Sequence, residues 1–181
     1  LENLDHWLDD FFKNEDRGVS ITLPLKEAAL NYADEISDRA RLASSCNVIY
    51  AKDKKLFGDN TDGHGLVMDL ENNLKVNLKD MKILILGAGG AARGIIPSII
   101  EKNPSKLKIA NRTENKARLL KEDLGGKVDL KGKSLIFEAG GLTDDFLLAD
   151  SYDLVINSTS VSTQAGEFLG LPKALFSGTK L

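Results

Sequence analysis

The chain has 181 residues, of which 42% are hydrophobic and 28% charged, and its formal net charge is −3. This composition is typical of a folded globular protein, and the charge balance gives no support for nucleic-acid binding, which usually shows as a basic surplus. A single cysteine excludes an intramolecular disulfide, no cluster of ligand residues indicates a metal site, and no apolar run reaches membrane-spanning length. We therefore expect a cytoplasmic enzyme or binding protein.

The first half of the chain, up to about Leu74, predicts a mixture of helices and short strands. The chain begins with apolar residues at helical spacing. A segment in which apolar and polar residues alternate then ends at Pro24, and Ser37 further on is a typical N-cap residue. In chain order we expect a helix over residues 4–12, a strand at 19–23, helices at 26–32 and 38–43, strands at 47–50 and 56–57, a loop at 58–63, and a helix from 64 to 70.

The second half alternates strands with helices. After a polar linker at 72–80 we expect a strand at 82–86, a helix to about 102, a strand at 107–110, a helix at 114–124, and strands at 134–137 and 153–157. Strands that alternate with helices predict a parallel, doubly wound sheet. We therefore expect a two-domain α/β protein, divided into residues 1–75 and residues 80–181.

The junction between the strand at 82–86 and the helix after it has the spacing G-x-G-x-x-A, from Gly87 to Ala92. The first glycine permits a tight turn, the second lets a pyrophosphate approach the backbone, and the small third residue lets the helix pack closely against the strand. Phosphates would then bind the unpaired N–H groups at the helix N-terminus. This junction predicts a dinucleotide site without indicating which dinucleotide.

The end of the next strand selects among dinucleotides. NAD enzymes usually place an acid there, whereas NADP enzymes place an arginine that holds the 2′-phosphate. Here Ala110 leads into Asn111-Arg112-Thr113, with Lys116 close behind and no acid at the strand end. Because Arg112 can form a forked, charge-assisted contact with phosphate, we expect NADP as the cofactor.

Lys26 and Asp62 are the candidates for chemistry in the first half. Lys26 stands at the start of an expected helix, where the helix dipole disfavours a cation, and Asp62 lies in the dense polar loop at 58–63. Taken alone, Lys26 also fits an ordinary surface lysine, and Asp62 fits an ordinary loop carboxylate. A lysine and an aspartate that converge on one hydroxyl would suit alcohol–ketone interconversion, in which one takes the hydroxyl proton while hydride leaves the same carbon.

Six short segments occur together and in one order. They are SITLPLKE at 20–27, Cys46-Asn47, GDNTDG at 58–63, GAGGAARG at 87–94, Asn111-Arg112-Thr113 and NSTS at 157–160. Together, over about Gly18 to Pro172, they closely resemble the shikimate dehydrogenase family. The resemblance implies the reversible, NADPH-dependent reduction of 3-dehydroshikimate to shikimate, in the biosynthesis of chorismate and the aromatic amino acids.

The resemblance also implies a role for each matching position. It makes residues 1–75 the substrate-binding and catalytic domain and residues 80–181 the NADP-binding Rossmann domain. Lys26 and Asp62 match the catalytic pair, and both also match substrate-binding positions, as do Thr22 and Asn47. Cofactor contacts are implied for Asp38, Gly87, Ala88, Gly89, Gly90, Ala91, Asn111, Arg112, Thr113, Lys116, Thr159 and Ser160. The assignment of acid and base between Lys26 and Asp62 stays open.

The resemblance further implies segments before Leu1 and after Leu181 that complete the substrate site, so we expect the chain to be a fragment. One alternative is an NAD-preferring quinate/shikimate dehydrogenase, against which the missing acid after Ala110 argues. The other is a non-catalytic dinucleotide-binding protein, against which Lys26 and Asp62 argue. We expect a monomer or a homodimer with small-molecule ligands and no nucleic-acid, membrane or metal partner.

Overall fold

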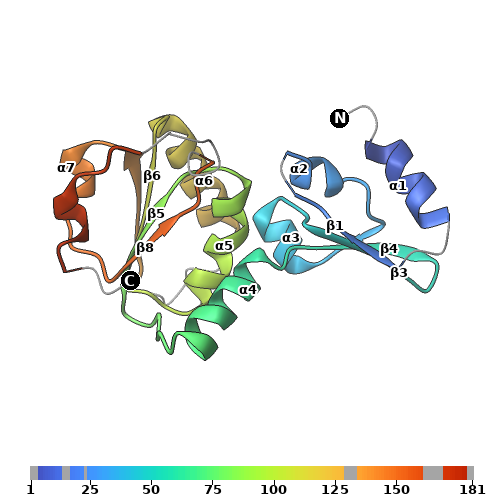
Figure 1. Cartoon of the computed structure of the whole chain (residues 1–181), viewed down its shortest axis with the longest axis horizontal. Helices are drawn as coiled ribbons and strands as arrows, with labels where there is room; N and C mark the ends of the chain where they lie inside the picture. Colours follow the sequence, from blue (N-terminus) through green and yellow to red (C-terminus); the bar gives the residue numbers. More distant parts are fainter. Residues whose placement is uncertain (1–3, 14–16, 23, 129–133, 161–168, 179–181) are drawn as a thin grey trace.

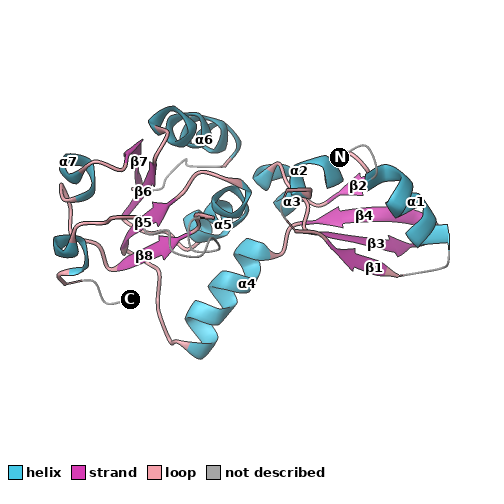
Figure 2. Ribbon diagram, turned by 45° about the horizontal axis from the view of Figure 1, so that its top comes forward, coloured by secondary structure: helices cyan, strands magenta, loops and turns pink. Residues whose placement is uncertain are grey.

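The structure is a computed structural model that describes residues 4–13, 17–22, 24–128, 134–160 and 169–178. It contains two sheets, each flanked by helices, at opposite ends of an elongated molecule (Figure 1). Helix α4 (Asp62–Met68) begins beside the first sheet and packs along helix α5 (Gly90–Glu101) of the second half (Figure 2). The two halves therefore meet where α4 and α5 are in contact.

The first sheet has the strand order β1-β3-β4-β2. β3 pairs antiparallel with both β1 and β4, whereas the short β2 runs parallel to β4. Asp53 and Lys54 form the turn between β3 and β4 with positive φ angles of 51° and 61°, which suits a two-residue hairpin turn of type I′. The elements of this half are α1 (Leu4–Lys13), β1 (Gly18–Ser20), α2 (Lys26–Ala29), β2 (Glu35–Ile36), α3 (Asp38–Ala43), β3 (Val48–Lys52) and β4 (Lys55–Asp59).

The second sheet has the strand order β7-β6-β5-β8, and all its strands are parallel. Numbered from its first strand, the order is 3-2-1-4, which is that of a Rossmann sheet. Besides α5, the elements that follow α4 along the chain are the π-helix η1 (Asp69–Asn73), β5 (Lys82–Leu86), β6 (Lys106–Asn111), α6 (Glu114–Lys127), β7 (Ile136–Gly141), α7 (Asp144–Leu147), β8 (Leu154–Asn157) and the 3-10 helix η3 (Lys173–Phe176).

Strand β5 is buried on both faces of this sheet. Ile83 and Ile85 join the hydrophobic cluster under α5 and α6, whereas Leu84 and Leu86 join a separate cluster with Leu147 of α7. A strand covered on both faces is apolar at every position rather than at alternate ones, which explains the continuous run in the sequence. The doubly wound parallel sheet expected from the sequence is confirmed.

Some expected bounds in the first half are wrong. The strand expected over 19–23 ends at Ser20, because a turn begins with the hydrogen bond from Leu25 N to Thr22 O at 3.0 Å; Leu23 lies outside the described residues. The helix expected over 26–32 is the short α2, after which two i→i+3 hydrogen bonds hold residues 30–32 in turns. The two-residue strand β2 was not expected.

The segment expected as a loop at 58–63 also differs. β4 runs to Asp59, and α4 begins at Asp62 rather than at residue 64, so Asp62 lies in the first turn of a helix. The residues expected as a polar linker, 72–80, contain Leu78, which is fully buried. Val67 and Leu70 pack in the same cluster as the second sheet, and the domain boundary between residues 75 and 80 stays a prediction.

The second half also differs from the expectation at several elements. α6 continues through Gly125 and Gly126 to Lys127. β7 begins at Ile136 rather than at residue 134 and ends at Gly141, because it pairs in register with the whole of β6. The short helix α7, with Thr143 as its N-cap, was not expected.

Candidate active site

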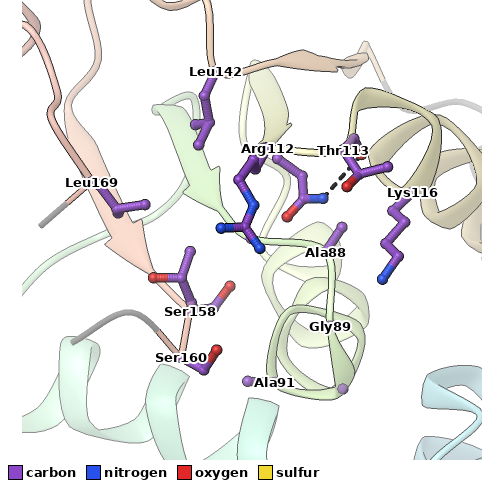
Figure 3. Close-up of a pocket in the computed structure, with 14 residues that line it drawn as sticks. Ala88, Gly89, Ala91, Arg112, Thr113, Lys116, Leu142, Ser158, Ser160 and Leu169 are labelled. Carbon is purple, nitrogen blue, oxygen red and sulfur yellow. Dashed lines mark hydrogen bonds between the residues drawn. The ribbon is translucent and has the colours of Figure 1, made fainter. Parts of the chain in front are cut away.

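The glycine turn after β5 forms the wall of a cavity of about 790 Å³ (Figure 3). Gly87 has a φ of +108°, and a Cβ there would lie 2.8 Å from Ser158 Oγ, so this turn requires glycine. Gly89 is the N-cap of α5 and supplies no side-chain cap, which leaves the first N–H groups of the helix without a side-chain acceptor. Such a helix N-terminus is suited to bind phosphate.

Most of the residues expected to contact a cofactor line this cavity. They are Gly87, Ala88, Gly89, Gly90, Ala91, Asn111, Arg112, Thr113, Lys116, Thr159 and Ser160. The structure therefore brings together segments from the ends of β5, β6 and β8, although they are far apart in the sequence. Their roles toward a ligand stay predictions.

Arg112 follows β6 directly and projects into the cavity (Figure 3). Its neighbour Asn111 donates a hydrogen bond from Nδ2 to the carbonyl oxygen of Thr113 at 3.0 Å, which closes the turn before α6. Arg112 and Lys116 are both exposed on the same side of this turn and carry positive charge. An anionic group in the cavity would therefore meet two cations and a helix N-terminus.

Asp62 and Lys26 form an ion pair in the first half, although 36 positions separate them in the sequence. Lys26 Nζ lies 2.6 Å from Asp62 Oδ2, and 13% and 24% of the two side chains are exposed. Asn47 Nδ2 donates to the other carboxylate oxygen, Oδ1, at 2.7 Å. The pair is thus partly shielded but open enough for a ligand to reach it. A lysine donor and a carboxylate acceptor side by side can exchange a proton with a substrate hydroxyl.

Hydrogen bonds between segments that are distant in the sequence hold the backbone around this pair. Asn47 Oδ1 accepts the N–H of Thr61 at 2.9 Å, and Cys46 N donates to Lys26 O at 2.8 Å. The Cys46 thiol is fully buried and donates to Val48 O at 3.0 Å. Burial raises the pKa of this thiol, which is consistent with a small apolar core residue rather than a nucleophile.

Asp59, the other acid of the segment 58–63, has a structural role. It accepts hydrogen bonds from Ser37 Oγ at 2.5 Å and from Asn60 N at 2.7 Å, and it forms an ion pair with Arg39. Burial alone would raise the pKa of Asp59, but the hydrogen bonds and the charge of Arg39 outweigh it and lower the pKa. Asp59 thus connects the end of β4 to the start of α3 through these hydrogen bonds and the ion pair.

Two of the expected site residues, Thr22 and Asp38, are neither among the residues that line the cavity nor among the hydrogen-bond partners of Asp62. Thr22 is exposed, and its carbonyl oxygen accepts the N–H of Leu25. Asp38 is exposed in the first turn of α3 and does not line the cavity. Their proposed contacts with substrate and cofactor stay predictions.

Sequence reasoning missed other residues of the site. Leu142 and Leu169 line the cavity, and Ser158 Oγ donates to Leu86 O at 2.7 Å, which ties β8 to the glycine turn. The Cβ position of Gly94 would lie 3.2 Å from Asp62 Oδ2, and Asn60 Oδ1 accepts the backbone N–H of Asp62 at 3.1 Å. Ser158, Asn60 and Gly94 stand in the segments that carry the family resemblance, and that is the signal that could have found them, whereas Leu142 and Leu169 lie outside those segments.

Within the described ranges, no three acidic, histidine or cysteine side chains come together as metal ligands. Among the described helices, none has both the length and the apolar character that a membrane crossing needs.

Two family models match the chain. One, described as shikimate / quinate 5-dehydrogenase, matches residues 69–165. The other, described as the substrate binding domain of shikimate dehydrogenase, matches residues 1–49. The two matches cover segments from both halves of the molecule.

Individual relatives agree with the family models. The NADP(+)-dependent shikimate dehydrogenase of Colwellia psychrerythraea is 42% identical over 168 residues, which cover 93% of this chain and 57% of the relative. The solved structure of the Ael1 enzyme from Pseudomonas putida has a TM-score of 0.81 and 33% identity, covering 95% of this chain and 59% of that one.

The shikimate 5-dehydrogenase of Thermus thermophilus, solved with NADP(H) and shikimate, has a TM-score of 0.77 and 31% identity. That match covers 97% of this chain and 60% of the Thermus chain, so the chain spans less than two thirds of each relative. These findings confirm the resemblance in the sequence: the chain belongs to the shikimate/quinate 5-dehydrogenase family.

Proposed function

We propose that the protein is an NADP-dependent shikimate dehydrogenase that reversibly reduces 3-dehydroshikimate to shikimate. The observation that carries the proposal is the Lys26–Asp62 ion pair, which lies against the same helix α5 that begins at the glycine turn. The curated relative of 42% identity is named for this activity and cofactor, and the Thermus structure contains NADP(H) and shikimate.

The residues around the glycine turn fit NADP. The cavity volume of about 790 Å³ is in the range of small-molecule and cofactor sites. We assign the pyrophosphate to the N-terminus of α5 and the 2′-phosphate to Arg112 and Lys116, because no acid stands at the end of β6 to bind a free ribose hydroxyl. NADP is therefore favoured over NAD.

The chain's own residues would manage the proton of the reaction. NADPH, when bound, supplies the hydride that reduces the C3 carbonyl carbon of 3-dehydroshikimate. Lys26 and Asp62 hold the oxygen on that carbon, and one of them delivers the proton that converts it to a hydroxyl. Asn47 fixes the carboxylate through its 2.7 Å hydrogen bond, so the pair keeps one geometry. In the reverse direction the same group takes the proton back.

The test is a spectrophotometric assay of the protein with shikimate and either NADP or NAD. With shikimate and NADP we expect the absorbance of NADPH to appear. With shikimate and NAD we expect NADH to form much more slowly. Activity with quinate and NAD in preference to shikimate and NADP would favour the quinate/shikimate alternative. NADP binding by calorimetry without any turnover would favour a non-catalytic binding protein. The cytoplasmic location expected from the sequence is part of the proposal.

A further inference from the structure

Helices α4 and α5 approach each other through glycine. A Cβ placed on Gly63 would lie 2.7 Å from the carbonyl oxygen of Gly94 and 2.6 Å from Ser98 Oγ. A side chain at Gly63 would therefore force the two helices apart, since one of these contacts is with backbone. The crossing fixes the distance between the helix that carries Asp62 and the helix that begins at the glycine turn.

The Cβ position of Gly94 also points toward the candidate catalytic carboxylate. A Cβ on Gly94 would lie 3.2 Å from Asp62 Oδ2, the oxygen that accepts Lys26 Nζ at 2.6 Å. The same Cβ would lie 3.2 Å from both the nitrogen and the oxygen of the Asn60 amide. The backbone of α5 at Gly94 is thus one wall of the Asp62 site, and it leaves no room for a methyl group at ordinary contact distance.

Asn60 holds the backbone of Asp62. Its side chain is only 2% exposed, and its Nδ2 donates to Ser45 Oγ at 2.8 Å and to Ser45 O at 3.1 Å. Its Oδ1 accepts the backbone N–H of Asp62 at 3.1 Å. Because the amide has partners at both its nitrogen and its oxygen, it cannot turn away without leaving buried polar groups unpaired.

We propose that Gly94 and Asn60 are positioning residues that set the place of the Asp62 carboxylate relative to the cofactor turn. Gly94 lies one helical turn after Gly90, about 6 Å along α5 at the usual rise per residue. Any shift of α5 at this point is therefore a shift of the nucleotide turn relative to Lys26 and Asp62. The consequence for turnover rests on the proposed function, whereas the consequence for the ion pair does not.

An alanine at Gly94 should displace Asp62 Oδ2 by a few tenths of an ångström, because the methyl group would sit inside normal contact distance. Misplacement of a reacting group by about 1 Å can cost about a hundredfold in rate, so we expect Gly94→Ala to lower kcat about tenfold. The KM for NADP should change less than about twofold, because the glycine turn and Arg112 are untouched.

The experiment compares three variants with the wild-type protein. Gly94→Ala and Asn60→Ala perturb the two positioning residues. Gly65→Ala is the matched control, because Gly65 is an exposed glycine of α4 whose added Cβ would meet nothing within 4 Å. Steady-state kinetics give kcat and KM, and thermal melts report folding. The NMR resonance of the Lys26 ammonium, identified by its loss in Lys26→Ala, reports the ion pair without turnover.

We expect lower kcat, near-normal KM for NADP and a shifted Lys26 resonance in both positioning variants, and no change in Gly65→Ala. Wild-type kcat and an unshifted resonance in Gly94→Ala would overturn the proposal. If Gly94→Ala does not fold, the kcat and the Lys26 resonance of Asn60→Ala support or overturn the proposal in its place. If the wild-type protein shows no turnover, the proposed function fails, and the Lys26 resonance alone supports or overturns the positioning role.

Discussion

Asparagine in place of Asp150 should destabilise the second sheet, because two lysines of β6 depend on that carboxylate. Lys106 Nζ lies 2.9 and 2.8 Å from the two oxygens of Asp150, and Lys108 Nζ lies 3.0 Å from Oδ2. Only 2% of the Lys108 side chain and 16% of the Asp150 side chain are exposed. The Asp150→Asn variant would thus leave a buried ammonium group without its nearest counter-charge.

The magnitude follows from what remains around Lys108. Removal of one partner of a buried ion pair typically costs about 3–5 kcal/mol. Here the Glu138 carboxylate stays 3.6 Å from Lys108 Nζ, and the carbonyl oxygen of Phe146 accepts its hydrogen bond at 2.8 Å. We therefore expect Asp150→Asn to lower the free energy of unfolding by about 2–4 kcal/mol.

The control is Lys108→Met, which replaces the buried ammonium with an apolar side chain of similar length and leaves Asp150 paired with Lys106. Because an apolar replacement needs no counter-charge, this variant should lose less than about 1.5 kcal/mol. Urea titrations followed by circular dichroism measure both differences. A loss below about 1 kcal/mol for Asp150→Asn, or equal losses in the two variants, would refute the reasoning.

The Asp150 carboxylate also makes the difference in unfolding free energy between wild type and Asp150→Asn depend on pH. Burial alone would raise the pKa of Asp150, but the hydrogen bonds and charges of Lys106 and Lys108 outweigh it and lower the pKa. A lowered folded-state pKa stabilises the fold above the unfolded value of about 3.9, and this contribution is lost as the pH falls through the folded value. The difference between wild type and Asp150→Asn should therefore shrink below about pH 4.

Three further predictions concern the site. Lys26→Ala should lower turnover by about 10²–10⁴-fold in steady-state assays, the usual contribution of a positioned acid or base, and near-normal turnover would exclude that role. Arg112→Asp should weaken NADP far more than NAD in calorimetric titrations, because it removes charge-assisted bonds worth about 1.5–3 kcal/mol each, and equal losses would refute the 2′-phosphate assignment. Cys46 in the folded protein should react with thiol reagents far more slowly than in urea, since its thiol is buried and its pKa is raised.

The second half of the protein was readable from its sequence because its signals are local. The apolar run of β5, the glycine turn and the start of α5 follow one another within a few residues, and each has a physical reason at that position. The parallel sheet then follows from the alternation of strands and helices. The expected strand bounds were wrong where strand pairing determines them. β7, for example, begins only where Lys106 of β6 pairs with it.

The first half was less readable from its sequence because its geometry depends on residues that are distant in the sequence. The segment 58–63 is rich in residues that favour turns, so local preference predicts a loop. Asn60, however, donates a hydrogen bond to Ser45 and accepts one from the N–H of Asp62. With these contacts α4 begins at Asp62. Pattern alone could nominate Asp62, but it could not show that the carboxylate lies in the first turn of a helix.

The glycines of the α4–α5 crossing show why a site between two halves is hard to see in a sequence. Glycine inside a helix costs about 1 kcal/mol relative to alanine, so Gly63 and Gly94 reduce the local preference of both helices. Each is explained only by its partner on the other helix, 31 positions away, where a Cβ would meet backbone or the Asp62 carboxylate. The two glycines therefore do not stabilise the helices in which they lie. These glycines permit a close approach of α4 and α5, which places Asp62 Oδ2 beside Gly94, one helical turn after Gly90, and the methyl group of Gly94→Ala would disturb that approach.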